Sequence, residues 1–197
     1  MIRSLSFLSP GNFPDDDPYA GLEDTLRLFE LGEQLGFDGA WIRQRHLEHG
    51  VSAGAVFLAA AAQRTQRVQL GTAVIPIGYE SPFRLAEDLS TADVLSRGRL
   101  QVGLSAGRPP HLDLMGPLVF DGDWRSYDFS HGRIARLIHS ARRGARGRPG
   151  PRLAPGRGSG AVTGRAYGAV PGHRQVLGPR AYLLLICPGN RLLIQSR

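Results

Sequence analysis

Two cationic side chains stand next to each other directly after a short apolar run. The run "AWI" leads into Arg43, Gln44, Arg45 and His46. Large cations that follow a buried strand are costly unless they face a cleft, because a charge that loses its water needs a partner. We therefore expect Arg45 and His46 to be functional residues. The alternative is that both are ordinary polar residues at a point where the chain leaves a strand.

The segment "HLEH" offers three side chains of the kind that bind metal ions, His46, Glu48 and His49. Zinc sites take imidazole and carboxylate ligands, but these stand at defined spacings on a helix or together with a second cluster. The segment lies on no predicted helix and has no second cluster at such a spacing. We therefore expect no metal site.

A group of acidic side chains farther along the chain is a second candidate for catalysis. It consists of Glu87, Asp88 and Asp93, each three or four residues from Arg84 or Arg97. That spacing is typical of ion pairs along the surface of a helix. We interpret these acids as a structural set that caps and stabilises a helix, and not as catalytic residues.

Strand-like and helix-like segments alternate over the first 110 residues. The expected strands are residues 4–9, 37–42, 67–77 and 99–107. The expected helices are residues 22–35, 53–65, 81–96 and 129–139. The strands begin about 30 residues apart, which is typical of consecutive βαβ units and hence of a parallel sheet.

A parallel sheet of this kind belongs either to a doubly wound fold or to a closed (β/α) barrel. The dinucleotide-binding version of the first would show G-x-G-x-x-G after the first strand, and "SPGNFPDDD" has no such pattern. A barrel needs eight βα units and typically about 250 residues, whereas four units fit before residue 110. We predict the α/β class, with the first half of a (β/α)8 TIM barrel as four parallel βα units.

The charge of the chain changes abruptly after this region. All 17 acidic residues lie at or before Asp128; residues 1–137 carry 13 Arg and a net charge of −4, whereas residues 138–197 carry 11 Arg, no acid and a net charge of +11. Gly and Pro are frequent in the second part, and only "AYLLLIC" reads as a possible strand. We predict a partial barrel domain over 1–137 and an irregular, disordered basic tail over 138–197.

The basic tail has two further interpretations. An arm of Arg and Gly attracts nucleic-acid phosphates through its charge alone, but residues 138–166 contain no aromatic residue and no regular repeat, so we expect no specific nucleic-acid partner. Arg, Gly and Pro also have GC-rich codons, and a shifted reading frame in a GC-rich gene produces this mixture. We favour an out-of-frame tail.

Cysteine content and hydropathy indicate a cytoplasmic protein. Cys187 is the only cysteine, so no intrachain disulfide can form, which fits a reducing compartment. The apolar run from Leu5 to Leu8 is too short for a signal peptide. No run approaches the roughly 18 apolar residues of a membrane span, so we expect no membrane partner.

Three segments resemble the bacterial luciferase-like family of flavin-dependent monooxygenases. They are "DGAWIRQRHLEHGVS", "VQLGTAVIPIGYESPFRLAEDLSTADVLSRGRLQVGLSAG" and "DFSHGRIARLI". The resemblance covers about residues 1–137, and its most specific part is residues 68–107, with a Leu-Gly-Thr-Ala strand end, a Pro-Phe-Arg-x-Ala-Glu-Asp helix and a Ser-x-Gly-Arg-Leu turn. It implies a TIM barrel with its site at the carboxyl ends of the strands.

The resemblance also implies roles for single residues. The family often has Glu-His-His after the second strand, with a histidine as general base near the flavin; here His46 keeps the second histidine and Arg45 replaces the first. We expect both to be catalytic residues, with Arg45 holding an anionic group. Phe7, on the first strand, is a candidate for substrate contact or for core packing.

Small residues end the third and fourth strands. The family commonly has a non-proline cis peptide at the position of Ala73–Val74, which supports the isoalloxazine ring of the flavin. The cofactor-binding residues that the resemblance implies are Thr72, Ala73, Val74, Ser105, Ala106 and Gly107. The alternative for these positions is a plain buried strand with small residues for packing.

For the function, the resemblance implies an oxidoreductase that uses O2 and reduced FMN, supplied by a separate flavin reductase, on an organic substrate. Members that use the deazaflavin F420 share the barrel, so F420 is the alternative cofactor. For intact members the resemblance also implies a homodimer. Because the phosphate-binding loops after strands seven and eight are not legible in this sequence, we expect a truncated chain with little or no activity.

Overall fold

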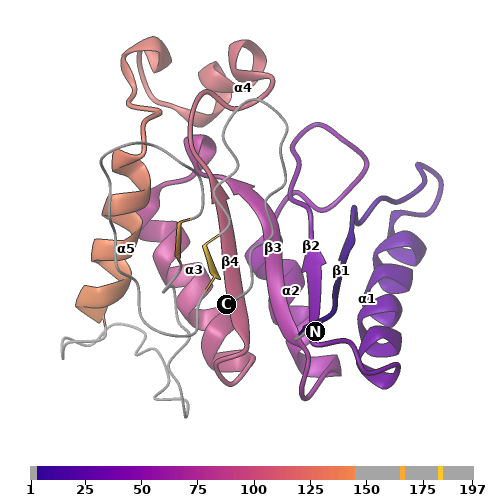
Figure 1. Ribbon diagram of the computed structural model, residues 1–197. Coiled ribbons are helices and arrows are strands. Elements are labelled where there is room, and N and C mark those ends of the chain that lie inside the picture. Colours follow the sequence, from indigo (N-terminus) through magenta and orange to yellow (C-terminus); the bar gives the residue numbers. More distant parts are fainter. Residues whose placement is uncertain (1–3, 145–164, 167–181, 184–197) are drawn as a thin grey trace.

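A parallel four-stranded sheet forms the centre of the protein (Figure 1). The computed structural model describes residues 4–144, 165–166 and 182–183. The strands are β1 (Ser6–Ser9), β2 (Gly39–Ile42), β3 (Gln69–Pro76) and β4 (Leu100–Ser105), and each pairs in parallel with the next in chain order. The prediction of four parallel strands in sequential order, without a doubly wound crossover, is confirmed.

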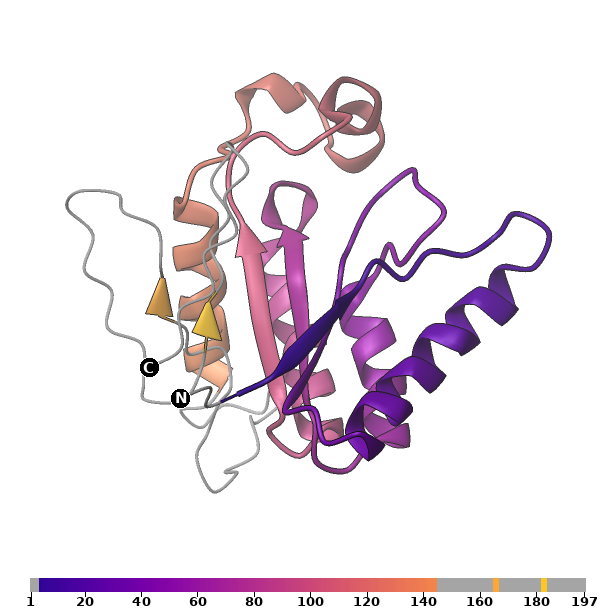
Figure 2. The same cartoon turned by 45° about the vertical axis from the view of Figure 1, so that its right-hand side comes forward.

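Helices follow each strand and lie on one side of the curved sheet (Figure 2). They are α1 (Pro18–Gln34), α2 (Gly54–Arg64), α3 (Pro82–Leu95) and α5 (Gly132–Gly144), with a 3₁₀ turn η1 (Ile77–Tyr79) between β3 and α3. Their starts follow local chemistry: the Asp17 carboxylate accepts a hydrogen bond from the Ala20 amide at 2.9 Å, and Ser81 caps α3 ahead of Pro82. The arrangement is that of half a (β/α) barrel.

The core lies between the sheet and the helices. Alternate strand residues such as Ile42 and Leu70 point to the helix side and are fully buried, together with Phe29 of α1 and Leu89 of α3. The other face of the sheet carries side chains of mixed size, among them Trp41 of β2, Gly71 and Gln69 of β3 and Gln101 of β4. A Cβ atom at Gly71 would lie 2.0 Å from the ring of Trp41, so glycine there lets the indole lie across the neighbouring strand.

The turn before β4 is built around a buried arginine. Arg99 is 9% exposed, and its guanidinium donates hydrogen bonds to atoms of α2, of the segment after α2 and of Ser96. Ser96 also accepts a hydrogen bond from the Arg99 amide at 3.2 Å, and Gly98 has a φ of +79°. The Ser-x-Gly-Arg-Leu motif therefore joins the ends of two helices to the start of β4.

The acidic set on α3 forms ion pairs at only two of its three positions. Glu87 and Asp88 both pair with Arg84, the second at 3.7 Å. Asp93 differs, since it is 1% exposed and makes no ion pair with Arg97 or any other cation among the described residues. The prediction of an ion pair at Asp93 was wrong because this residue falls on the face of α3 that packs into the core.

A short helix after β4 was not predicted. α4 (Leu112–Val119) and the turn η2 (Trp124–Ser126) fold over Tyr79 and Phe120 as a small second core. Glycine and proline have low helix propensity, so Gly116 and Pro117 argue against a helix in the sequence. In the structure a Cβ at Gly116 would lie 2.6 Å from the Trp124 ring, so the glycine provides the space for that ring and tertiary contact stabilises the helix.

The described fold continues past the predicted domain end at residue 137. α5 runs to Gly144, and its side chains Ile138 and Ala141 are both 5% exposed. Two short strands, β5 (Arg165–Ala166) and β6 (Tyr182–Leu183), pair in parallel. The rest of the predicted tail lies outside the described residues, and the division of the chain after residue 137 stays a prediction.

Candidate functional site

The carboxyl ends of the four strands meet at one edge of the sheet, as parallel pairing requires (Figure 1). His46 follows β2, Ala73 and Val74 lie in β3, and Ser105 ends β4. The register pairs Ile42 with Thr72 and Pro76 with Ser105. The predicted site residues from β2, β3 and β4 therefore lie at the same end of the sheet.

The pairing between β3 and β4 is interrupted at this end. Thr72 pairs with Val102, and regular pairing resumes only at Ile75 and Leu104, so Ala73 and Val74 together stand opposite a single residue. The peptide bond between Ala73 and Val74 is cis, as the resemblance implies. The result is a bulge in β3.

Thr72 supports this bulge from inside the sheet. Its side chain is fully buried, its hydroxyl donates to the Gly103 carbonyl at 2.9 Å, and it accepts from the Gly103 amide at 3.0 Å. A Cβ at Gly103 would lie 2.3 Å from the Thr72 carbonyl oxygen. Thr72 therefore shapes the site but has no free group to offer a ligand.

The remaining predicted cofactor residues are partly exposed, and they lie in β3, at the end of β4 or directly after it. They are Ala73, Val74, Ser105, Ala106 and Gly107. Gly107 has a φ of +107°, and a Cβ built there would meet no atom within 4 Å; its amide donates to the Phe129 carbonyl at 2.8 Å. These five residues lie at the same end of the sheet, and four of them have small side chains or none; we call this set the small-residue surface.

A buried amide lies at the exit of β2, between the strand and the next helix. Gln44 is 3% exposed. Its Oε1 accepts from the Gly54 amide at 2.9 Å, and its Nε2 donates to Glu80 Oε1 at 2.9 Å. Burial raises the pKa of Glu80, opposed by the weaker effects of the Gln44 hydrogen bond and the Arg133 charge. Gln44 thus joins the segments after β2 and β3.

His46 packs into the same cluster. Its Nε2 lies 3.5 Å from Gln44 Nε2, and its ring meets Tyr79 edge-on at 5.1 Å between centroids. Burial lowers the pKa of His46, so the ring is held toward its neutral form. The Tyr79 hydroxyl donates to the Pro110 carbonyl, which ties this cluster to the segment before α4.

Arg133 of α5 fastens the segment after β3. Its Nε donates to the Ile77 carbonyl at 3.1 Å, and its Nη2 donates to the Glu80 carbonyl. Gln44, Glu80 and Arg133 belong to this cluster, although no sequence pattern predicts them there. The only sequence signal for Arg133 is its place at the start of the predicted helix 129–139, and no local pattern marks a partner 53 or 56 residues away.

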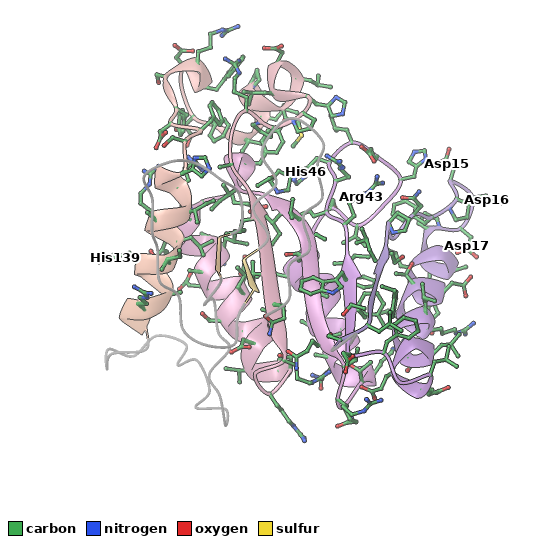
Figure 3. All side chains as sticks on the ribbon, in the orientation of Figure 1. Asp15, Asp16, Asp17, Arg43, His46 and His139 are labelled. Atoms are coloured by element: carbon green, nitrogen blue, oxygen red, sulfur yellow. The ribbon has the colours of Figure 1, made fainter. Side chains whose placement is uncertain are left out.

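Arg43 and Arg45 share one acid, and Figure 3 shows Arg43 and His46 near the carboxyl ends of the strands. Arg43 Nη2 lies 3.0 Å from Glu48 Oε2 and 3.2 Å from Asn12 Oδ1, and Arg45 Nε lies 4.0 Å from Glu48 Oε1. The Nε atoms of both arginines are buried and have no hydrogen-bond partner among the described residues. One carboxylate thus faces two cations, and positive charge is left over beside His46.

Phe7 lies away from this site. Its ring meets Phe29 at 5.6 Å and Phe37 at 5.3 Å between centroids, and a Cβ at Gly32 of α1 would lie 2.3 Å from it. Phe7 therefore points to the helix side of β1 and packs with the core. Of the two expectations for Phe7, the structure supports core packing, and the contact with substrate is withdrawn.

No group of three His, Cys, Asp or Glu side chains within the described part of the chain is placed to share a metal ion. No helix there is both long and apolar enough to cross a membrane.

The sequence matches the family described as luciferase-like monooxygenase over residues 2–151. The chain belongs to this family. Limonene 1,2-monooxygenase of Rhodococcus erythropolis is 40% identical over 106 residues, which make up 52% of this chain and 27% of that relative. 4-Hydroxyprotoasukamycin monooxygenase of Streptomyces nodosus subsp. asukaensis is 36% identical over 107 residues, or 53% and 29%. The chain spans less than a third of the length of these two family members.

Solved structures of this fold agree with the family assignment. Monooxygenase RslO1 of Streptomyces bottropensis has a TM-score of 0.57 at 29% identity over 72% of this chain and 43% of its own. The oxygenating constituent of 3,6-diketocamphane monooxygenase from the CAM plasmid of Pseudomonas putida, solved with FMN, has a TM-score of 0.61 at 16% identity, covering 75% and 41%.

The F420-dependent tetrahydromethanopterin reductase of Methanopyrus kandleri has a TM-score of 0.52 at 21% identity, covering 70% of this chain and 39% of its own. At these identities the diketocamphane and F420 enzymes show the fold alone. Together with the family match, they place the four βα units in the TIM-barrel fold of luciferase-like monooxygenases, as predicted.

Proposed function

We propose that this protein is a flavin-dependent oxidoreductase that uses reduced FMN and O2 on a small organic substrate. The observation that carries the proposal is that the small-residue surface lies at the end of the sheet to which β2 also brings His46. Small side chains leave room for a flat ring. The bulge in β3 places Val74 outside the regular strand pairing, where it could contact such a ring. The named monooxygenases among the relatives support the same reaction class.

The residues present fit a flavin. Ala73, Val74, Ser105, Ala106 and Gly107 would contact the isoalloxazine ring, because they are the partly exposed residues where β3 and β4 end. When bound, reduced flavin supplies the electrons that activate O2. The chain's own residues would orient the ring and exclude water from one of its faces, and His46, which follows β2 at the same end of the sheet, would lie at the border of the ring.

Arg45 supplies positive charge next to His46 in the sequence. Because Glu48 already neutralises part of the charge of Arg43, we propose that Arg45 holds an anionic group of the substrate or of the cofactor. F420 is the alternative cofactor, since an F420-dependent enzyme shares the fold. A separate flavin reductase and a second copy of the chain are the proposed protein partners.

A titration with each cofactor tests this proposal. FMN and F420 are added separately to the purified chain while absorbance and fluorescence are recorded. We expect binding of FMN, and we expect Ser105→Trp to weaken it at least about tenfold, which corresponds to about 1.4 kcal/mol, because the indole would cover the small-residue surface. Val56→Trp places the same side chain at an exposed position of α2 and serves as the control.

Each other result of this titration has a definite meaning. Binding of F420 without FMN selects the alternative cofactor. Equal affinities of wild type and Ser105→Trp place the cofactor elsewhere, and an absence of binding to both compounds contradicts the proposed function of this chain.

A further inference from the structure

The orientation of the Gln44 amide is determined by its neighbours. The Gly54 backbone N–H can only donate, so the Gln44 atom 2.9 Å from it must be the carbonyl oxygen. The amide nitrogen then faces the other way, toward Glu80 Oε1 at 2.9 Å. Gly54 is suited to this contact because a Cβ there would already lie 3.0 Å from Gln44 Oε1.

The second N–H of the Gln44 amide is available to His46. The Gln44 nitrogen carries two hydrogens and no acceptor site. One hydrogen is used by Glu80, and the nitrogen also lies 3.5 Å from His46 Nε2. Two N–H groups facing each other would repel, so a neutral His46 can accept from Gln44 only if its Nε2 carries a lone pair and its proton sits on Nδ1.

We infer that Gln44, held between Gly54 and Glu80, is a positioning residue that fixes neutral His46 in the tautomer protonated at Nδ1. In this tautomer Nδ1 carries the proton. Because Nδ1 has no hydrogen-bond partner among the described residues, it is free to donate to a ligand. This deepens the proposed function and rests on it for its meaning in catalysis. Neutral His46 would stabilise negative charge on an oxygen of substrate or cofactor, in place of acting as a general base through that nitrogen.

The tautomer can be measured directly by NMR. The full chain is labelled with ¹⁵N-histidine, and two-bond proton–nitrogen correlations are recorded at a pH where imidazoles are neutral. Of the six histidines, His46 is identified by the signal that disappears in His46→Gln. We expect the Nδ1–H tautomer of His46 to exceed the other by roughly tenfold, as a hydrogen bond of ordinary strength provides.

Gln44→Glu is the decisive variant. A glutamate at this position has at most one proton, and the carboxylate of Glu80 competes for it, so no donor remains for His46 Nε2. We expect the tautomer preference to reverse. Gln44→Met removes the donor without adding charge and gives a second reading if the glutamate variant does not fold. The matched control is Gln69→Glu, which keeps the oxygen that accepts from Gln101 at 2.9 Å and should leave the His46 signals unchanged.

A wild-type His46 protonated at Nε2 would overturn the inference, and so would a tautomer that is the same in wild type and in both Gln44 variants. Because the measurement needs no cofactor, either result leaves the flavin titration to be judged by itself. A chain that binds no flavin but shows the Nδ1–H tautomer would lose the proposed function and keep this arrangement.

Discussion

Replacing Arg99 with alanine is expected to lower the free energy of unfolding by about 4 kcal/mol. The Arg99 guanidinium uses all five N–H groups: Nε donates to the Ser96 carbonyl at 2.8 Å, and Nη1 donates to Thr65 Oγ1 and the Val68 carbonyl, both at 2.9 Å. Nη2 donates to the carbonyls of Ala62 at 3.1 Å and Thr65 at 2.9 Å. Alanine would leave several buried carbonyls without a donor.

The position of these acceptors explains why the effect should be large. Ala62 and Thr65 lie at the end of α2, where helix carbonyls have no partner within the helix and carry partial negative charge. The guanidinium satisfies them and at the same time joins the end of α2 to the turn after α3. A point change at Arg99 therefore loosens three elements together.

Urea unfolding followed by circular dichroism measures this change. Arg97→Ala is the matched control, because Arg97 is an exposed arginine in the same turn, and its loss should alter the free energy of unfolding by less than about 0.5 kcal/mol. Arg99→Lys should fall between wild type and Arg99→Ala, since one ammonium cannot reach five acceptors. Equal stability of Arg99→Ala and wild type would show that the network contributes nothing.

Asp93→Asn is expected to stabilise the protein by about 2 kcal/mol at neutral pH. Burial raises the pKa of Asp93 to about 6, against a smaller opposite effect of the Leu100 amide. Each tenfold change in proton affinity corresponds to about 1.4 kcal/mol, and relaxation of the protein around the buried carboxylate reduces the sum. The amide of asparagine fills the same space without a charge.

The gain should depend on pH in a definite direction. In the unfolded chain the carboxyl of Asp93 titrates near its ordinary value of 3.8, and in the folded chain near 6. The charged form is the costly one, so the penalty is full above pH 6, decreases as the pH falls from 6 to about 4, and is absent below that. The advantage of Asp93→Asn should shrink over the same range.

Thermal and urea unfolding of both proteins at several pH values test this dependence. Asp88→Asn is the control, because Asp88 is an exposed acid on the same helix that pairs with Arg84. It should change stability little and without this pH profile. An Asp93→Asn protein that is less stable than wild type at pH 7 would mean that the buried carboxylate has a favourable partner.

The four βα units and their order can be predicted from the sequence alone. Strand and helix patterns are local, and the spacing of about 30 residues leaves room for one crossover helix between strands. The position of the predicted site at the carboxyl ends follows from parallel pairing, so the sequence alone places His46, Ala73 and Ser105 at one end of the sheet. The Ser-x-Gly-Arg-Leu motif is also recognisable in the sequence, but the hydrogen-bond partners of its arginine, Arg99, are not.

The contacts of single side chains, in contrast, depend on the folded backbone. Phe7 points to the helices. Its direction could not be predicted, because a four-residue strand with a mixed pattern does not reveal which of its faces is inside. Asp93 looks like a surface acid in sequence, and it is the packing of α3 that buries it. Gln44 and Glu80 are 36 residues apart, and their hydrogen bond exists because neighbouring parallel strands deliver both segments to one edge. Local patterns carry no information about such pairs, since their partners are chosen by the folded backbone.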